Sequence, residues 1–156
     1  MTRPAIPPVE KKLRVACSPE VAFEAFTRDI AEWWPVATHA LGAPDRVEKV
    51  VFECRQGGRI YELWRDGTRH EWGSVIAWDP PRSVAFSWHV GRPVEQASLV
   101  TLSFASAGQE TAVTLVHRDW ELLGDGAREV RDSYDAGWGR VFGEHYAAHV
   151  ALRQKP

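Results

Sequence analysis

Apolar and polar positions alternate through the middle of the chain. Apolar residues recur at helical spacing in a short segment near the N-terminus, after a first strand, and in a long segment at the C-terminus. Residues 9–16 predict a first strand. Ser18 followed by Pro19 predicts a helix start, because serine caps a helix and proline suits its first position. Residues 30–34 predict a second short helix, which the next proline ends. The segment 35–45 is too polar and broken to be core, and we expect a loop there.

Six further strands are predicted in succession, at residues 47–54, 59–64, 70–78, 83–89, 98–105 and 110–120. The dipeptides Gly57-Gly58 and Asp66-Gly67 are typical of tight hairpin turns, so the pattern indicates an antiparallel meander. The sequence does not decide which face of residues 70–78 points inward, because both alternating sets of side chains are partly apolar. The two sets are Trp72, Ser74, Ile76 and Trp78, and Gly73, Val75 and Ala77.

Residues 127–153 predict one long helix with an apolar and aromatic stripe. The stripe contains Tyr134, Trp138, Val141, Phe142, His145, His149 and Leu152. The element order is therefore β-α-α-β-β-β-β-β-β-α, which predicts an α+β fold. We expect a curved antiparallel sheet of about seven strands that grips the long C-terminal helix, with a cavity between them. Residues 1–8 predict a flexible tail, and residues 9–153 a single domain.

Length and charge narrow the class of protein. A chain of 156 residues and 17.6 kDa matches one domain of ordinary size. Nineteen basic against 21 acidic residues give a net charge of −2, which argues against nucleic-acid binding. No apolar run is long enough to cross a membrane, and the N-terminus lacks the apolar stretch of a signal peptide. We therefore expect a cytoplasmic protein with no nucleic-acid or membrane partner.

Cysteine and tryptophan usage point to different features. Cys17 and Cys54 each stand alone in a strand-like context, which predicts two buried free thiols and no zinc ribbon. Eight tryptophans against one methionine give the chain an unusual amount of large, rigid aromatic surface. Tryptophan commonly lines pockets or interfaces with its N–H facing a polar partner, so the composition indicates a binding pocket or an interface.

A series of short motifs runs along the chain in a fixed order. They are Ser18-Pro19-Glu20-Val21-Ala22-Phe23, Trp33-Trp34-Pro35, Gly57-Gly58-Arg59-Ile60-Tyr61-Glu62, Trp72-Gly73-Ser74-Val75, Asp79-Pro80-Pro81-Arg82, Val84-Ala85-Phe86-Ser87-Trp88, Thr111-Ala112-Val113-Thr114-Leu115-Val116-His117 and Gly137-Trp138. In order and spacing the sequence resembles the START-like (SRPBCC, birch-pollen-allergen-like) helix-grip superfamily, from about residue 9 to residue 152. Within it, the motifs are similar to the branch of heat-shock-protein-90 ATPase activator homologues.

The resemblance implies an internal pocket for a small, mostly apolar molecule. Some members of the superfamily are cyclases or hydrolases, and many only bind. The eukaryotic activators carry a basic interaction motif in a separate domain, and this sequence contains no such motif. The resemblance therefore supports the fold more strongly than the function in the branch name.

Ten residues are predicted to contact the ligand: Trp33, Trp34, Tyr61, Trp72, Phe86, Trp88, His117, Tyr134, Trp138 and Phe142. The aromatic rings would supply stacking area, with His117 and Tyr134 as polar contacts. Adjacent helical positions point about 100° apart, so Trp33 and Trp34 can hardly serve one surface, and either could be a packing wedge. His117 lies on the apolar face of its strand, where a hydrogen-bonded core histidine is the alternative to a polar handle.

Metal and cofactor chemistry has little support in the sequence. His145 and His149 are four residues apart on a helix, a spacing that lets two imidazoles reach one metal ion. A catalytic zinc site needs a third protein ligand, and the chain has neither a His-Glu-x-x-His motif nor a nearby cysteine, which leaves His117 as a conceivable third ligand. We therefore predict no metal and no cofactor.

Catalytic residues cannot be assigned from a motif, because the chain contains neither a nucleophile elbow nor a phosphate loop. A strand carboxylate could act as acid or base only if it were buried beside a substrate. The candidates are Glu53, Glu62 and Glu71. Three glycines in the last helix, Gly137, Gly139 and Gly143, indicate either close approach to the sheet or room for a ligand beside Trp138.

The sequence predicts that the protein binds a small hydrophobic or aromatic molecule between the sheet and the C-terminal helix. The first alternative is a cyclase- or hydrolase-type enzyme that uses the same cavity, which an enclosed cavity with a buried carboxylate would favour. The second is a co-chaperone-like module that binds a chaperone or a second copy of the chain. An extended exposed apolar patch would favour that module.

Overall fold

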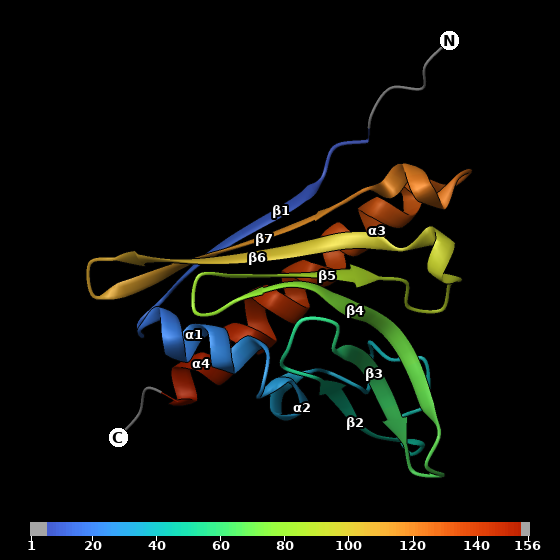
Figure 1. Cartoon of the computed structure of the whole chain (residues 1–156), viewed down its shortest axis with the longest axis horizontal. Coiled ribbons are helices and arrows are strands. Elements are labelled where there is room, and N and C mark those ends of the chain that lie inside the picture. Colours follow the sequence, from blue (N-terminus) through green and yellow to red (C-terminus); the bar gives the residue numbers. More distant parts are fainter. Residues whose placement is uncertain (1–5, 154–156) are drawn as a thin grey trace.

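In the computed structural model, which describes residues 6–153, seven strands form one antiparallel sheet (Figure 1). The strands are β1 (Val9–Val15), β2 (Val47–Phe52), β3 (Arg59–Trp64), β4 (Arg69–Asp79), β5 (Ser83–Trp88), β6 (Ser98–Ala107) and β7 (Glu110–Arg118). Their order across the sheet is β1-β7-β6-β5-β4-β3-β2. The predicted meander is confirmed, and the first strand joins it by pairing with the last.

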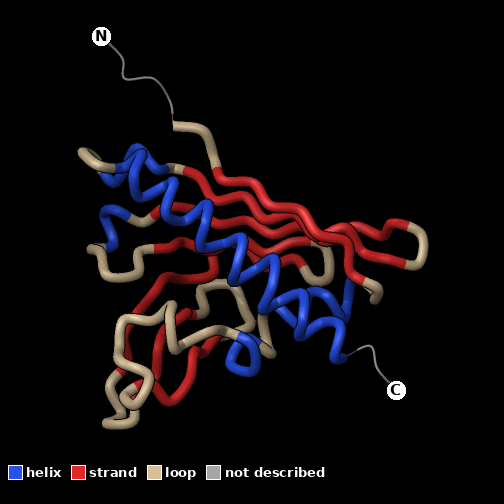
Figure 2. Tube along the Cα trace, turned by 180° about the vertical axis from the view of Figure 1, so that it is seen from behind, coloured by secondary structure: helices blue, strands red, loops and turns tan. Residues whose placement is uncertain are grey.

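Helices gather on one face of this sheet, as the predicted α+β fold requires. They are α1 (Pro19–Phe26), α2 (Ile30–Trp33), α3 (Ala127–Arg140), a π-helical segment η3 (Val141–Tyr146) and α4 (Ala147–Arg153), with short 3₁₀ turns η1 (Val94–Gln96) and η2 (Trp120–Leu123). Figure 2 shows α3, η3 and α4 as one continuous rod that crosses the strands diagonally. No helix in the described part of the chain is long and apolar enough to cross a membrane.

Strict alternation along three central strands produces the apolar inner face. Strands β5, β6 and β7 bury every second residue, as expected from the two-residue period of a strand. The buried positions are Val84, Phe86 and Trp88, then Ser98, Val100, Leu102 and Phe104, then Thr111, Val113, Leu115 and His117. Removing these side chains from water against the long helix is the main force that holds the helix on the sheet.

Strand β4 buries Trp72 and Val75 and half-buries Trp78, and these three residues belong to neither alternating set alone. Its pairing with β3 shifts register opposite Ile60, and its pairing with β5 shifts again around Ile76, which is exposed. Each bulge adds one residue to the strand and so moves the following side chains to the other face. Simple alternation therefore could not identify the inner face of this strand.

The buried stripe of the C-terminal helix differs from the predicted one after Trp138. Phe142, Tyr146 and Val150 are buried at intervals of four, whereas His145 and Leu152 are exposed. The π-helical segment η3 has more residues per turn than an α-helix, so positions four apart stay in line. The prediction assumed 3.6 residues per turn throughout, and it was wrong for His145 and Leu152 for that reason.

Two smaller sequence predictions, for the cysteines and for the N-terminal tail, can be compared with the structure. Cys17 is a buried free thiol as predicted, but Cys54 is exposed, because strand β2 ends two residues earlier and Cys54 lies in the following turn. Of the predicted tail, residues 1–5 lie outside the described part. Its last residues are held by the protein: the Ile6 amide donates to Glu121 at 2.9 Å, and Arg131 donates to the carbonyls of residues 7 and 8.

Candidate ligand-binding site

A cavity of about 320 Å³ lies between the sheet, helix α3 and the loop that follows α2. Its volume is at the lower end of the range for small-molecule pockets, about 300–1,000 Å³. It is lined by Trp34, Thr38, His39, Ala40, Trp72, Trp88, Val90, Ser133, Tyr134, Gly137, Trp138 and Val141. Four tryptophans from four different segments therefore surround one small space.

The four indoles form a continuous aromatic wall. The Trp34 ring lies 4.9 Å from that of Trp72, 5.9 Å from that of Trp88 and 6.1 Å from that of Trp138. Trp88 also contacts Trp72 at 5.3 Å and Trp138 at 5.6 Å. The Trp34–Trp138 and Trp72–Trp88 pairs are edge-to-face, and the other three pairs are tilted, all at separations typical of favourable aromatic contacts. The wall thus offers rigid aromatic faces and edges to a molecule in the cavity.

The buried carboxylate of Glu62 holds one indole of this wall and the loop above it. It accepts hydrogen bonds from Nε1 of Trp72 at 2.7 Å and Nε1 of Trp64 at 3.0 Å. It also accepts from the backbone amides of Leu41 at 2.5 Å and Gly42 at 3.0 Å. Four N–H donors occupy the four lone-pair positions of the two oxygens, so none remains for a substrate. Glu62 is therefore an anchor for the wall and the loop, and its acceptor positions are filled.

His117 orients a second indole through a chain of hydrogen bonds. Its Nδ1 accepts from Nε1 of Trp138 at 3.0 Å, which makes Nε2 the protonated nitrogen, and Nε2 lies 2.6 Å from Oγ of Ser98. The Ser98 hydroxyl then donates to the carbonyl of Trp88 at 3.1 Å. Burial lowers the pKa of His117 to about 3, so the ring is neutral at physiological pH. His117 is thus a satisfied core residue that lies behind the lining of the cavity, in contact with Trp138 and Tyr134.

The other two indole N–H groups are also bonded within the protein. Nε1 of Trp34 donates to the carbonyl of His39 at 2.6 Å, and Nε1 of Trp88 donates to the Tyr134 hydroxyl oxygen at 3.2 Å. All four indoles of the wall therefore have their polar atom satisfied before any ligand enters. An aromatic or apolar molecule could bind beside them without leaving a buried donor unpaired.

His39 places an imidazole at the loop side of the cavity. Its Nδ1 lies 2.7 Å from Oγ1 of Thr38. Burial, and then the charges of His145 and Arg140, lower the pKa of His39 below its ordinary value. A Cβ on Gly137 would lie 3.8 Å from Nε2 of His39, so the loop and helix α3 approach each other here at ordinary contact distance. A neutral imidazole thus faces the cavity from the loop.

Five of the predicted ligand contacts line the cavity: Trp34, Trp72, Trp88, Tyr134 and Trp138. The other five predicted contacts, Trp33, Tyr61, Phe86, His117 and Phe142, are buried elsewhere and are not part of its lining. Trp33 packs against Phe26 and Tyr146, and its Nε1 donates to the carbonyl of Ala25. The two adjacent tryptophans therefore serve different surfaces, as their spacing suggested.

Seven lining residues were not among the predicted ligand contacts: Thr38, His39, Ala40, Val90, Ser133, Gly137 and Val141. Three of them belong to the loop after α2, which has no periodicity and is anchored from β3 by Glu62. The one available signal was the position of this loop after the Trp33-Trp34-Pro35 motif. In the helix-grip superfamily that the sequence resembles, that loop lies at the mouth of the cavity.

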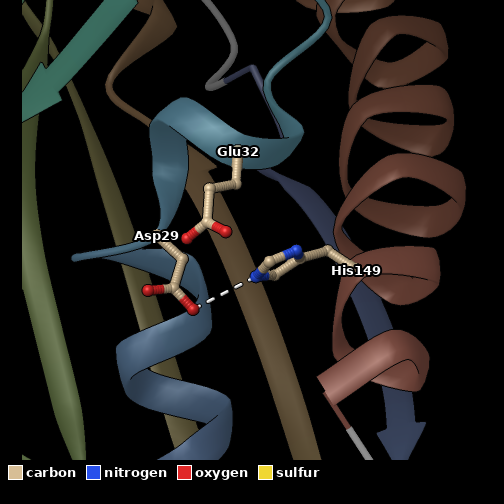
Figure 3. Close-up of side chains that lie close together, drawn as sticks. All are labelled: Asp29, Glu32 and His149. Atoms are coloured by element: carbon tan, nitrogen blue, oxygen red, sulfur yellow. Dashed lines mark hydrogen bonds and ion pairs between the residues drawn. The ribbon is translucent and has the colours of Figure 1, made fainter. Parts of the chain in front are cut away.

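A second, more open hollow of about 490 Å³ lies farther along the C-terminal helix, between its last turns and α2. Beside it, ligand atoms of Asp29, Glu32 and His149 lie within 4.8 Å of one another (Figure 3). The Asp29 oxygen that contacts Nε2 of His149 at 3.1 Å also accepts from the Arg153 guanidinium at 3.0 Å. The fixed positive charge of Arg153 makes this group an ion-pair network. His117, considered from the sequence as a third metal ligand, is enclosed elsewhere.

Purified protein is expected to contain no stoichiometric zinc, because Arg153 already neutralises Asp29 and no thiolate belongs to the group. Elemental analysis after purification without chelators measures the metal content directly. About one zinc per chain, lost in the variant His149→Ala, would contradict this expectation.

A search of the curated proteins finds no match. Among solved structures, the anthrahydroquino-gamma-pyrone synthase Txn09 is 33% identical, with a TM-score of 0.63 over 93% of this chain and 97% of that chain. The self-sacrificing resistance protein CalC from Micromonospora echinospora is 25% identical, with a TM-score of 0.68 over 96% and 99%. Protein MLL2253 from Mesorhizobium loti, 16% identical with a TM-score of 0.66 over 96% and 99%, shares the fold.

The family assignment rests on a match across most of the chain. The model of the family described as Activator of Hsp90 ATPase homolog 1-like protein matches residues 16–150. This range runs from the end of β1 into α4 and so includes every element that borders the cavity. The chain belongs to the family of Activator of Hsp90 ATPase homolog 1-like proteins, within the START-like helix-grip superfamily.

Proposed function

We propose that this protein binds one planar aromatic, largely apolar molecule in the cavity between the sheet and helix α3. The observation that carries the proposal is the wall of four indoles, each with its N–H already bonded inside the protein. Such a wall gives contact area and stacking without demanding polar partners from the ligand. The family and the two more similar solved structures support a small-molecule role.

Two glycines of helix α3 provide a matched test. Gly137 lines the cavity, whereas Gly139 does not, and a Cβ at Gly139 would meet no atom within 4 Å. A leucine at position 137 should fill the cavity and reduce the affinity for indane, a planar bicyclic hydrocarbon, at least tenfold. A leucine at position 139 should leave the affinity unchanged. Isothermal titration calorimetry with indane measures both variants and the wild type.

The free energy of unfolding serves as the control for this pair of variants. A glycine inside a helix lowers the stability of the helix by about 1 kcal/mol relative to a good helix former. Both variants should therefore be at least as stable as the wild type in urea unfolding. Equal loss of indane binding in Gly137→Leu and Gly139→Leu, or undiminished binding in both, would contradict the assignment of the cavity.

A second candidate function is ring closure on a bound aromatic substrate, supported by His39. A neutral imidazole at the cavity can act as a general base, and a solved structure that is 33% identical is named a synthase of a gamma-pyrone. The test substrate is 2′-hydroxydibenzoylmethane, whose phenol oxygen attacks the distant carbonyl, forming a C–O bond and losing water to give a flavone.

If the second candidate holds, the protein should accelerate flavone formation, and His39→Ala should remove most of the acceleration while binding persists. Absorbance at the flavone band follows the reaction. Rates equal to the buffer rate in the wild type would leave binding as the function.

The third interpretation, a surface that binds a chaperone or a second copy, has weaker support. The large exposed apolar residues of the described chain come from five separate segments: Leu41, Ile76, Val94, Leu122 and Leu152.

A further inference from the structure

The hydrogen-bond donors around the cavity are not all used by the protein. Each indole N–H of the wall is bonded internally, to His39, Glu62, Tyr134 or His117. The Thr38 hydroxyl lies 3.4 Å from the carbonyl of Pro35, an acceptor for its proton. Donors of this kind offer nothing further to a ligand, so the polar character of the site depends on the groups that remain.

Tyr134 is the exception because of the direction of its hydrogen bond. Its hydroxyl oxygen accepts from Nε1 of Trp88 at 3.2 Å, so the bond is made by the oxygen lone pair and leaves the hydroxyl proton available. Among the residues that the structure describes, none accepts that proton in a hydrogen bond. The Tyr134 ring is packed against His117 at 5.1 Å and Trp120 at 5.5 Å, which fixes where the hydroxyl lies.

The surroundings keep this hydroxyl protonated and favour an acceptor beside it. Burial raises the pKa of Tyr134 above its ordinary value, against the smaller opposing effects of the Trp88 hydrogen bond and the Arg92 charge. Arg92 therefore lies near enough to act electrostatically on the site. A positive charge close to the donor favours an oxygen with partial negative charge at the position that the proton faces.

We propose that the Tyr134 hydroxyl donates a hydrogen bond to the ligand, so that the site selects planar aromatic molecules bearing a carbonyl oxygen, namely aryl ketones and quinones. This inference rests on the proposed function, because it assigns the ligand class of the same cavity. Tyr134 is thus a specificity-determining residue, and the tryptophan wall supplies the remaining contact with the ligand.

Two ligands that differ by one carbonyl test the inference: indane and 1-indanone. A ketone is better hydrated than the hydrocarbon, so a cavity without a free donor would bind indane more tightly. With the Tyr134 proton available, 1-indanone should bind the wild type about three- to tenfold more tightly than indane. Calorimetric titration of both ligands gives this ratio directly.

The variants separate Tyr134 from its neighbours. In Tyr134→Phe alone, the freed Trp88 N–H could replace the missing donor, so the comparison uses Trp88→Phe and the double variant Trp88→Phe/Tyr134→Phe. The preference for 1-indanone should persist in Trp88→Phe and vanish in the double variant. Ser133→Ala, which removes the exposed hydroxyl at the cavity rim, should retain it.

The outcomes distinguish this inference from the proposed function. Binding of indane with no preference for 1-indanone in the wild type would overturn the role of Tyr134 and leave the cavity assignment standing. A preference that survives in the double variant, or disappears in Ser133→Ala, would also overturn it. Failure of both ligands to bind the wild type would overturn the proposed function and this inference together.

Discussion

Replacing Glu62 by alanine should destabilise the protein by about 4 kcal/mol or more. The substitution leaves four N–H donors without an acceptor, and each unsatisfied buried donor costs about 1–3 kcal/mol. Two of these donors belong to the loop over the cavity and two are indoles, so the loss combines loop release with a disturbed wall. Urea unfolding at neutral pH measures the change.

The matched control is Glu48→Ala, because Glu48 is exposed on the neighbouring strand β2. A surface substitution of this kind should change the free energy of unfolding by no more than about 0.5 kcal/mol. If Glu62→Ala were as stable as Glu48→Ala, the role of Glu62 as a structural anchor would be wrong. Its carboxylate would then have to be explained by a function.

Acid should destabilise the protein through His117 over a defined range of pH. The pKa of this ring is lowered to about 3 in the folded state, against about 6.5 in an unfolded chain. Between these values the unfolded state binds one more proton, so the free energy of unfolding falls as the pH falls from about 6.5 towards 3. The stabilisation is complete above pH 6.5, and its full loss amounts to about 4–5 kcal/mol.

The variant His117→Gln isolates this effect from that of the other titrating groups. Glutamine keeps an amide donor for Ser98 and cannot take up a proton in this range. Urea unfolding at pH 7, 6, 5 and 4 should show a flatter pH dependence in the variant, by about one proton at the steepest point. Identical pH profiles would show that His117 is not the buried neutral group described above.

The sheet could be predicted well from the sequence because its signal is local. Alternation in β5, β6 and β7 follows from the two-residue period of a strand, and turn dipeptides such as Asp66-Gly67 separate neighbouring strands. Two bulges in β4 and the π-helical segment η3 break the regular periods that this reasoning assumes. The inner face of β4 and the stripe beyond Trp138 were therefore beyond its reach.

The candidate site was only half predictable for a related reason. Aromatic residues on regular elements, such as Trp88 and Trp138, could be assigned to the inner side from their spacing. His39 lies on a loop whose position depends on distant hydrogen bonds to Glu62, and spacing carries no such information. Phe86 shares the inner face with Trp88 but packs against Phe26 and Phe52, because the cavity occupies only one end of the sheet.

The most direct test of ligand binding in this cavity is a nuclear magnetic resonance titration of the indole N–H signals with indane. Each of the eight tryptophans contributes one signal, and each is an independent reporter of its surroundings. The largest saturable shifts should belong to the cavity wall: Trp34, Trp72, Trp88 and Trp138. Much smaller shifts should belong to the remaining four, Trp33, Trp64, Trp78 and Trp120. Absence of saturable shifts in the wall, or largest shifts among the remaining four, would contradict the proposed binding site.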